Sequence, residues 1–386
     1  MKSFLAFIAL ACVVSASPFE SEQVPFGVDY QHPDFPGYDL SALRLIEMEG
    51  QPPVFWTELE KIQAKARGIK FFDITDTRNL GTLPRLQVKA SFPSPNATEK
   101  VKPIIETLST KGPEENLRVF SGFRTRHYRS DTGRQSQVWL KKRIAEITSE
   151  WGSKSLQNKI SISDFPHSWG QNSIITRING SSNTDDGVVI IGAHQDSTNT
   201  WPFLPAPGAD DDGSGSVTIL ESYRALLAAD FHPERSIEFH WYSAEEGGLL
   251  GSQAVAQAYE GRVNVLAMSQ FDMTAWVKRG TREEVGIIGD FVDLPLTKFN
   301  KQLVETYLDI PWVDTECGYA CSDHASWGKA GFPSSFTIES TFGNSNKNIH
   351  SANDRIDVSD EFSFSHMLEF SKLAVAFAVE LGGVSN

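Results

Sequence analysis

The sequence has few cysteines, fewer basic than acidic residues, and no long hydrophobic run beyond its first residues. Only three of its 386 residues are cysteine, which excludes a small scaffold built on disulfides. Lysine and arginine number 35 against 49 aspartates and glutamates, a net charge of −14. Proteins that bind nucleic acid or anionic membranes carry basic surplus or basic stripes, so we expect neither partner. Hydrophobic residues still make up 40% of the chain, enough for a large core.

A short apolar run stands at the N-terminus. Lys2 supplies one positive charge, Phe4–Val14 is apolar, and small residues follow at Ser15 and Ala16. This is the pattern of a secretory signal peptide, and the run is too short to cross about 30 Å of hydrocarbon comfortably. We therefore predict that residues 1–16 are a signal peptide and that the protein is secreted. A buried N-terminal helix is the alternative.

Removal of the signal peptide takes Cys12 with it and leaves Cys317 and Cys321. An oxidising compartment favours a disulfide between them, rather than free thiols or half of a zinc site. The short loop would then stiffen the turn that carries Tyr319.

Two acceptor patterns for N-linked glycans occur in the chain. They begin at Asn96 and Asn179. In a secreted protein both asparagines are predicted to lie on the surface and to carry glycans.

The composition of the chain changes near residue 85. Residues 17–85 contain seven prolines, one helical pattern at Phe55–Ala66, and a candidate extended segment at Gly68–Thr75. Secreted hydrolases often carry such a segment as a removable pro-region. We predict a pro-region at 17–85 and the functional domain at 86–386. The alternative is an extension that stays packed on the fold.

From residue 86 onward, strand patterns alternate with helix patterns. Short apolar runs predict strands at 187–192, 236–242, 263–273, 285–288 and 334–338. Helical spacing predicts helices at 101–108, 136–147, 216–229, 254–259, 295–307 and 361–381, with a polar loop between the first two. Such alternation implies an α/β fold. We expect a single α/β/α sandwich whose central sheet is mixed and mostly parallel.

Carboxylates and a histidine follow the predicted strands. They are His194 and Asp196, the run Asp210–Asp212 just before a helix, the pair Glu245–Glu246, and Asp272. The carboxyl ends of strands in an open α/β sheet form its binding sites. So many carboxylates in one place repel each other unless a cation neutralises them. Carboxylates with imidazole suit zinc or a related first-row metal ion.

Each of these pieces alone has a plainer interpretation, as a surface histidine, a helix cap or a solvated loop. Their joint position at successive strand ends favours a metal site. Other hydrolase chemistries lack their motifs. No Gly-x-Ser-x-Gly elbow and no His-Glu-x-x-His pattern occurs, which argues against a serine hydrolase and a one-zinc helix protease.

The segments that follow the predicted strands resemble those of the secreted two-zinc aminopeptidases of the M28 peptidase family. They are His194–Ser197, Pro207–Gly215, Ala244–Gly247 and Asp272-Met273, and Cys317–Trp327 and Ile349-His350 match the family as well. The resemblance covers about residues 100–380, and the whole chain is similar to fungal precursors of this kind. It implies that residues 86–386 are a zinc aminopeptidase catalytic domain holding two Zn²⁺. By the same resemblance, Asp211 bridges both ions, and the remaining ligands are His194 and Asp272 for one ion and Glu246 and His350 for the other.

The resemblance also implies roles for residues beside the ligands. Glu245 is expected to be the general base and then the acid, and Tyr319 to donate a hydrogen bond to the oxyanion. Asp196 is expected to orient the ring of His194. Asp212 lies beside the ligands, and its peptide bond to Asp211 is often cis in the family.

The family's substrate pocket corresponds to positions that are apolar or aromatic here, so leucine and similar first residues should fit. The pocket residues are Met273, Tyr319, Phe336, Ile338, Phe342 and Ile349. The expected partners are peptides with a free N-terminus and the chain's own pro-region, as an inhibitor or a folding aid, and the protein is expected to be a monomer. Two rivals share the fold: a one-zinc glutaminyl cyclase and a non-catalytic binding module. A count of bound metal ions separates all three.

Overall fold

The computed structural model describes residues 27–83, 91–182 and 187–384. Its centre is an eight-stranded sheet in the order β10-β9-β11-β8-β6-β7-β5-β4. The four adjacent strands β11, β8, β6 and β7 run parallel, β10 is parallel to β9, and the other three pairings are antiparallel. The predicted fold class, a mixed and mostly parallel sheet, is confirmed. The strands are β4 (Ile160–Phe165), β5 (Ser173–Ile178), β6 (Val188–His194), β7 (Ile237–Tyr242), β8 (Val265–Phe271), β9 (Val285–Ile288), β10 (Trp312–Thr315) and β11 (Ser334–Ile338).

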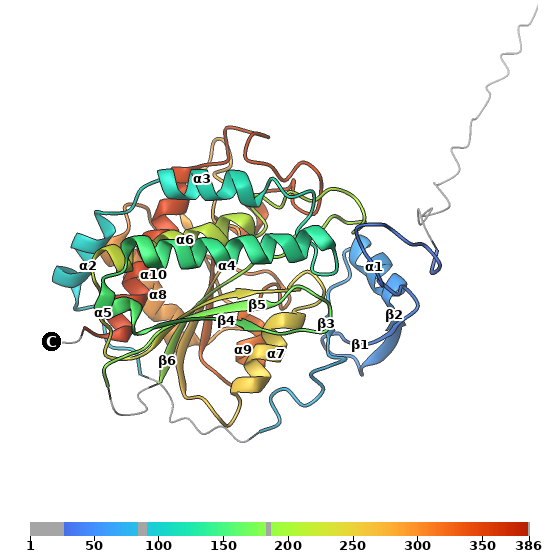
Figure 1. Ribbon diagram of the computed structural model, residues 1–386, viewed down its shortest axis with the longest axis horizontal. Helices are drawn as coiled ribbons and strands as arrows, with labels where there is room; N and C mark the ends of the chain where they lie inside the picture. Colours follow the sequence, from blue (N-terminus) through green and yellow to red (C-terminus); the bar gives the residue numbers. More distant parts are fainter. Residues whose placement is uncertain (1–26, 84–90, 183–186, 385–386) are drawn as a thin grey trace, which may run out of the picture.

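Helices cover both faces of this sheet (Figure 1). One layer contains α2 (Thr98–Ile105), α3 (Lys111–Phe120), α4 (Asp131–Trp151), α5 (Lys154–Gln157), α6 (Gly213–Ala228), α8 (Leu294–Tyr307) and α10 (Phe364–Gly382). The other contains α7 (Leu250–Tyr259) and α9 (His324–Lys329). A 3-10 turn spans Phe342–Asn344. The chain is thus the α/β/α sandwich that the sequence predicts.

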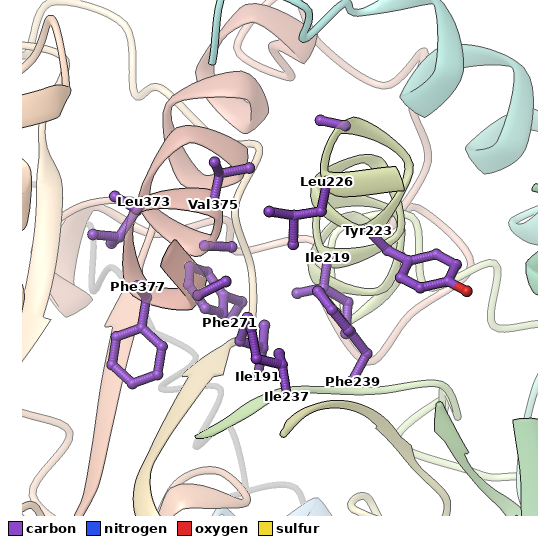
Figure 2. Close-up of a cluster of buried hydrophobic side chains, with 14 of the residues drawn as sticks. Ile191, Ile219, Tyr223, Leu226, Ile237, Phe239, Phe271, Leu373, Val375 and Phe377 are labelled. Atoms are coloured by element: carbon purple, nitrogen blue, oxygen red, sulfur yellow. The ribbon is translucent and has the colours of Figure 1, made fainter. Parts of the chain in front are cut away.

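The central strands are buried on both faces because their side chains alternate between two cores. Val189 and Ile191 of β6 belong to the large cluster beneath α6 and α10, whereas Val188 and Ile190 pack toward α7 and α9. Figure 2 shows the first of these cores, where side chains of α6 and α10 meet those of the strands. This double packing fixes the sheet whose carboxyl edge carries the predicted site.

Several predicted elements have different bounds in the structure. The helix expected from Phe55 begins later, because Val54–Thr57 forms β2 and Thr57 caps α1 (Glu58–Ala66) in a reciprocal capping box with Glu60. The loop expected between the first two helices of the domain contains α3, whose Leu117 and Phe120 are buried. Strands β4, β5 and β10 and helix α9 were not predicted.

Part of the predicted pro-region, 27–83, lies at one end of the sandwich and contains a small sheet of its own (Figure 1). Strand β1 (Leu43–Glu47) pairs with β2 and with β3 (Phe72–Asp73), so the extended segment expected at Gly68–Thr75 is a strand only over two residues. Buried charges hold α1 to this sheet, since Asp73 lies 2.7 Å from Arg44 Nε and 3.1 Å from Lys61 Nζ. The signal peptide predicted at 1–16 lies outside the described residues.

In the part of the chain that the structure describes, no helix is both long and apolar enough to cross a membrane.

Candidate metal centre and substrate cleft

The predicted ligands all reach one edge of the sheet, as the strand-end rule requires. His194 is the last residue of β6, Asp272 follows β8 directly, and Glu246 comes four residues after the end of β7. Asp211 lies in the loop that ends at the first residue of α6, and His350 lies in the loop that precedes α10. Five segments that are far apart in the sequence therefore converge.

A first group of potential ligands consists of His194, Asp211 and Asp272, all buried. The Nε2 atom of His194 lies 3.1 Å from Oδ1 of Asp211 and 3.6 Å from Oδ2 of Asp272. Tetrahedral ligands at about 2.0–2.1 Å from zinc are separated by roughly 3.3 Å. These separations fit one zinc ion.

A second group consists of Asp211, Glu246 and His350. The Nε2 atom of His350 lies 3.0 Å from Oδ2 of Asp211 and 3.2 Å from Oε2 of Glu246. Asp211 thus offers one oxygen to each group, which is how a bridging carboxylate is placed. The five predicted ligands are brought together in the predicted pairs around Asp211.

The chemistry of the two groups also fits a cation. His194 Nε2, Glu246 Oε1 and Asp272 Oδ1 are buried and have no hydrogen-bond partner, a costly arrangement unless another group binds them. Burial acts to lower the pKa of His350, but Glu246 and Asp211 outweigh it and raise that pKa to about 9. In the metal-free site, protonated imidazoles balance the negative charge of the carboxylates. A bound metal ion would displace these protons and supply the positive charge instead.

Two further carboxylates hold the ligand loops. Asp196 accepts the backbone N–H groups of Glu245 and Glu246 at 3.1 and 3.2 Å, and its Oδ1 lies 3.4 Å from Nδ1 of His194. Asp212 accepts the backbone N–H groups of His194 and of two other residues, Gly215 and Met273. Its peptide bond to Asp211 is cis, as expected.

Glu245 lies beside the first group, with Oε2 4.0 Å from His194 Nε2. Its side chain is 12% exposed, so it can reach the cleft. Burial is the main cause that raises the pKa of Glu245, and the charges of Glu246 and Asp272 add to it against the opposing effect of His194. A carboxyl group in such a place holds a proton more readily than one in water.

A cleft opens over these ligands and is apolar on one side. All six predicted pocket residues line it, and Met273, Phe336 and Ile338 are almost wholly buried in the cluster beneath it. Tyr319 stands at the rim on a turn that the Cys317–Cys321 disulfide closes. The predicted disulfide is therefore present.

Residues of the N-terminal segment 27–83 line the same cleft. Ile69, Lys70 and Phe71, which follow α1, line it together with Lys65 from the last turn of α1. The Lys65 ammonium group forms an ion pair with Glu246 and donates a 2.8 Å hydrogen bond to the backbone carbonyl of the same residue. Lys70 Nζ lies 4.3 Å from the centre of the Tyr319 ring.

Sequence reasoning missed residues that support the ligands. Ser322 donates a 2.6 Å hydrogen bond to Oδ2 of Asp272. Asp354 accepts the backbone N–H groups of Asp210 and Asp211, each at 3.0 Å. Ser322 lies inside the segment that carried the family resemblance, which was its only signal, and nothing near Asp354 in the sequence marks its role.

Both asparagines of the glycan patterns are exposed. Asn96 precedes α2 and Asn179 follows β5. Their accessibility meets the first requirement for glycosylation, which stays a prediction.

Comparison with known proteins supplies the family. The model of the Peptidase family M28 matches residues 173–375, more than half of the chain. This chain belongs to the M28 peptidase family. Curated relatives include a leucine aminopeptidase 1 of Colletotrichum graminicola, 48% identical over 88% of this chain and 85% of that protein. A leucine aminopeptidase 1 of Neurospora crassa is also 48% identical, over 84% of this chain and 82% of its own.

A solved M28-type structure has the same architecture. The LapA aminopeptidase of Legionella pneumophila superposes with a TM-score of 0.77 and is 27% identical, over 89% of this chain and 95% of its own. Together with the family match, these relatives identify the M28 chain as a zinc-dependent aminopeptidase, a hydrolase that acts on peptides. The predicted enzyme class is confirmed.

Proposed function

We propose that this chain is a secreted aminopeptidase that removes leucine and other apolar residues from the N-terminus of peptides, using two zinc ions. One observation carries the proposal. Two three-residue ligand groups share Asp211, and both open into a cleft with an apolar wall. One group alone would suit a one-zinc enzyme such as a cyclase.

His194, Asp211 and Asp272 would hold one ion, and Glu246 and His350 would hold the other with Asp211. When bound, the two ions would supply Lewis acidity, which polarises a scissile carbonyl and lowers the pKa of water. His194, Asp211, Glu246 and Asp272 are buried, and His350 is partly exposed. Asp196, Asp212 and Asp354 accept backbone N–H groups of Glu246, His194 and Asp211, so little rearrangement is needed to receive the metal.

Glu245 is the proposed general base. Its carboxylate lies next to the ligands without belonging to either group, and its partial exposure lets Oε2 face a substrate in the cleft. In the proposed role it takes a proton from the attacking water and then gives it to the leaving amine.

Tyr319 is proposed to donate its phenolic hydrogen to the developing oxyanion. Burial, with Glu245 and Asp211 adding to it, raises the pKa of the Tyr319 hydroxyl, so the phenol keeps its proton. The Cys317–Cys321 disulfide and two hydrogen bonds from the turn to Asp290 hold the tyrosine at the rim.

The two ends of the cleft account for the proposed specificity. Met273, Phe336 and Ile338 offer an apolar wall for the first side chain, which favours leucine without excluding similar residues. At the ligand end, Glu246 already accepts an ammonium group, that of Lys65, on its carboxylate and its carbonyl. A free α-amine carries the same charge and could take that place, whereas an acetylated N-terminus could not.

This contact also supports the predicted role of residues 17–85 as an inhibitory pro-region. Lys65 lies where the substrate's amine would bind, and Ile69 and Phe71 line the cleft together with the apolar pocket residues. Peptide substrates would therefore enter only after the segment has left. Cleavage near residue 85, which lies outside the described residues, would allow that.

Secretion and the monomeric state are further parts of the proposal. The signal-peptide pattern and the Cys317–Cys321 disulfide support an oxidising, extracellular location. One chain provides both ligand groups, Glu245 and all six predicted pocket residues, so the proposed site needs no second chain.

The proposed function is tested on two versions of one peptide, Leu-Gly-Phe with a free and with an acetylated N-terminus. The processed enzyme should release leucine from the free peptide only, and mass spectrometry detects the loss. Internal cleavage of the acetylated peptide, or no cleavage of either, would contradict the proposal.

A further inference from the structure

Arg126 carries a fully buried guanidinium group close to the ligand loops. It comes from the connection between α3 and α4, outside the residues 173–375 that the family model matches. In the part of the chain that the structure describes, no carboxylate lies within ion-pair distance of this group. Its hydrogen bonds go to backbone carbonyls instead, which makes it unusual among buried arginines.

One of these carbonyls is that of Phe120 at the end of α3, 3.4 Å from Nη1, and the other three belong to the two loops that position the bridging site. Nε donates to Gln195 O at 2.9 Å, the residue directly after His194. Nη2 donates to Gly208 O at 2.8 Å, and Nη1 donates to Pro207 O, both in the loop that leads to Asp211. One side chain thus joins the loop that follows β6 to the loop that precedes α6.

The two loops are already in close contact at this point. The backbone N–H of Arg126 donates to Ser197 Oγ at 3.0 Å, and Ser197 Oγ donates to Ala206 O at 2.7 Å. Gly208 has a φ of +52°, and a Cβ there would lie 2.4 Å from Cβ of Ser197. The carbonyl of Gly208 can face the guanidinium only because no side chain separates the loops.

The charge of Arg126 strengthens its hydrogen bonds to the loop carbonyls. Burial lowers the pKa of Arg126 to about 10, and the charges of Asp354 and Asp196 oppose the decrease. The group therefore remains charged at neutral pH. This positive charge by itself repels a nearby cation, so the contribution of Arg126 to metal binding comes from the loop geometry that its charge-assisted hydrogen bonds fix.

We propose that Arg126 is a positioning residue for the metal centre, because it fastens the His194 loop to the Asp211 loop and so sets the place of Asp211 between the two ligand groups. This inference rests on the proposed two-metal site. Arg126 belongs to neither ligand group and does not line the cleft. Loss of the side chain should therefore weaken metal binding by about 10–100-fold, the usual effect of residues that orient ligands.

The test measures zinc affinity by competition with a chromogenic chelator, on the processed enzyme. Arg126→Met removes the charge and the donors, and Arg126→Lys keeps the charge with a different donor geometry. Arg177→Met is the matched control. Arg177 forms a 2.6 Å ion pair with Glu238 on β7 and a 2.8 Å hydrogen bond to Ser236, away from the ligand loops.

Arg126→Met is expected to bind zinc about 10–100-fold more weakly, to lose kcat with little change in KM at limiting zinc, and to regain activity in excess zinc. Arg126→Lys should lie between it and the wild type, and Arg177→Met should keep wild-type zinc affinity. Unchanged zinc affinity in a folded Arg126→Met would overturn the inference.

Folding of the variants is measured by circular dichroism. If Arg126→Met does not fold, the result for Arg126→Lys decides between the outcomes. A zinc affinity of Arg126→Lys at least about fivefold weaker than that of the wild type supports the inference, and an unchanged affinity overturns it. If neither folds without zinc, folding restored by excess zinc supports it. Failure to fold even then, while Arg177→Met folds, shows a role in the whole fold and overturns it. A wild-type enzyme that binds no zinc would instead refute the proposed function.

Discussion

If the N-terminal segment is the proposed inhibitor, the contact of Lys65 with Glu246 predicts how strongly this segment blocks the cleft. We consider the substitution Lys65→Met in the uncleaved chain, which keeps most of the side chain's volume and removes its charge. The ammonium group makes an ion pair with Glu246 and a 2.8 Å hydrogen bond to its carbonyl. Burial acts to lower the pKa of Lys65, but Glu246 and Glu245 outweigh it and raise that pKa, so the group is charged.

A hydrogen bond to a charged partner contributes about 1.5–3 kcal/mol. If the uncleaved chain cuts substrate only when the segment has opened, losing this contact should raise its activity by roughly 10–150-fold, at about 1.36 kcal/mol per tenfold change. The assay is hydrolysis of leucine p-nitroanilide by the uncleaved chain, with a gel to exclude processing.

Lys329→Met is the matched control. Lys329 also joins the two parts of the chain, through a 2.5 Å ion pair with Glu47, but away from the metal ligands and partly exposed. Exposed pairs contribute about 0.2–1 kcal/mol, so activity should rise less than about fivefold. Equal activity of the two variants, or no gain in Lys65→Met, would refute the reasoning that Lys65 closes the cleft.

The remaining predictions concern the processed enzyme. Glu245→Gln should lower kcat by about 10²–10⁴-fold while zinc content stays at the wild-type value; near-normal kcat would exclude Glu245 as the base. Tyr319→Phe should lower kcat by about 10²-fold with little change in KM, and an effect on KM alone would assign Tyr319 to binding only. Removal of zinc with a chelator should lower the unfolding temperature, because zinc at about 1,000 times its Kd stabilises a site by about 4 kcal/mol; an unchanged midpoint in differential scanning calorimetry would contradict a metal held by these ligands.

The central strands β6, β7, β8, β9 and β11 could be predicted from the sequence because they are buried on both faces, whereas β4 and β10 at the two edges are partly exposed. Strand β6 is a nearly continuous apolar run, and the proposed ligand His194 ends it. Glu246 follows β7 and Asp272 follows β8, and both strands are parallel to β6, so their place at one edge follows from the topology. The resemblance to a family was needed for His350, which follows no strand, and for the pairing of ligands around Asp211.

Other features could not be predicted, because the local sequence either indicated a different structure or carried no signal for them. Helix α3 contains Gly112 and Pro113, which read as a break, yet Leu117 and Phe120 are buried and hold it as a helix. Residues that meet only in three dimensions leave no local pattern. Lys65 reaches Glu246 across 181 positions.

The central claim, a pair of zinc ions around Asp211, is tested most directly by metal content. Zinc per chain is measured by inductively coupled plasma mass spectrometry on the processed enzyme and on Asp211→Asn, with hydrolysis of leucine p-nitroanilide followed as zinc is returned to the metal-free protein. We predict two zinc ions per wild-type chain, fewer in Asp211→Asn, and activity that returns with bound zinc. One ion or none in the active wild-type enzyme would contradict the account.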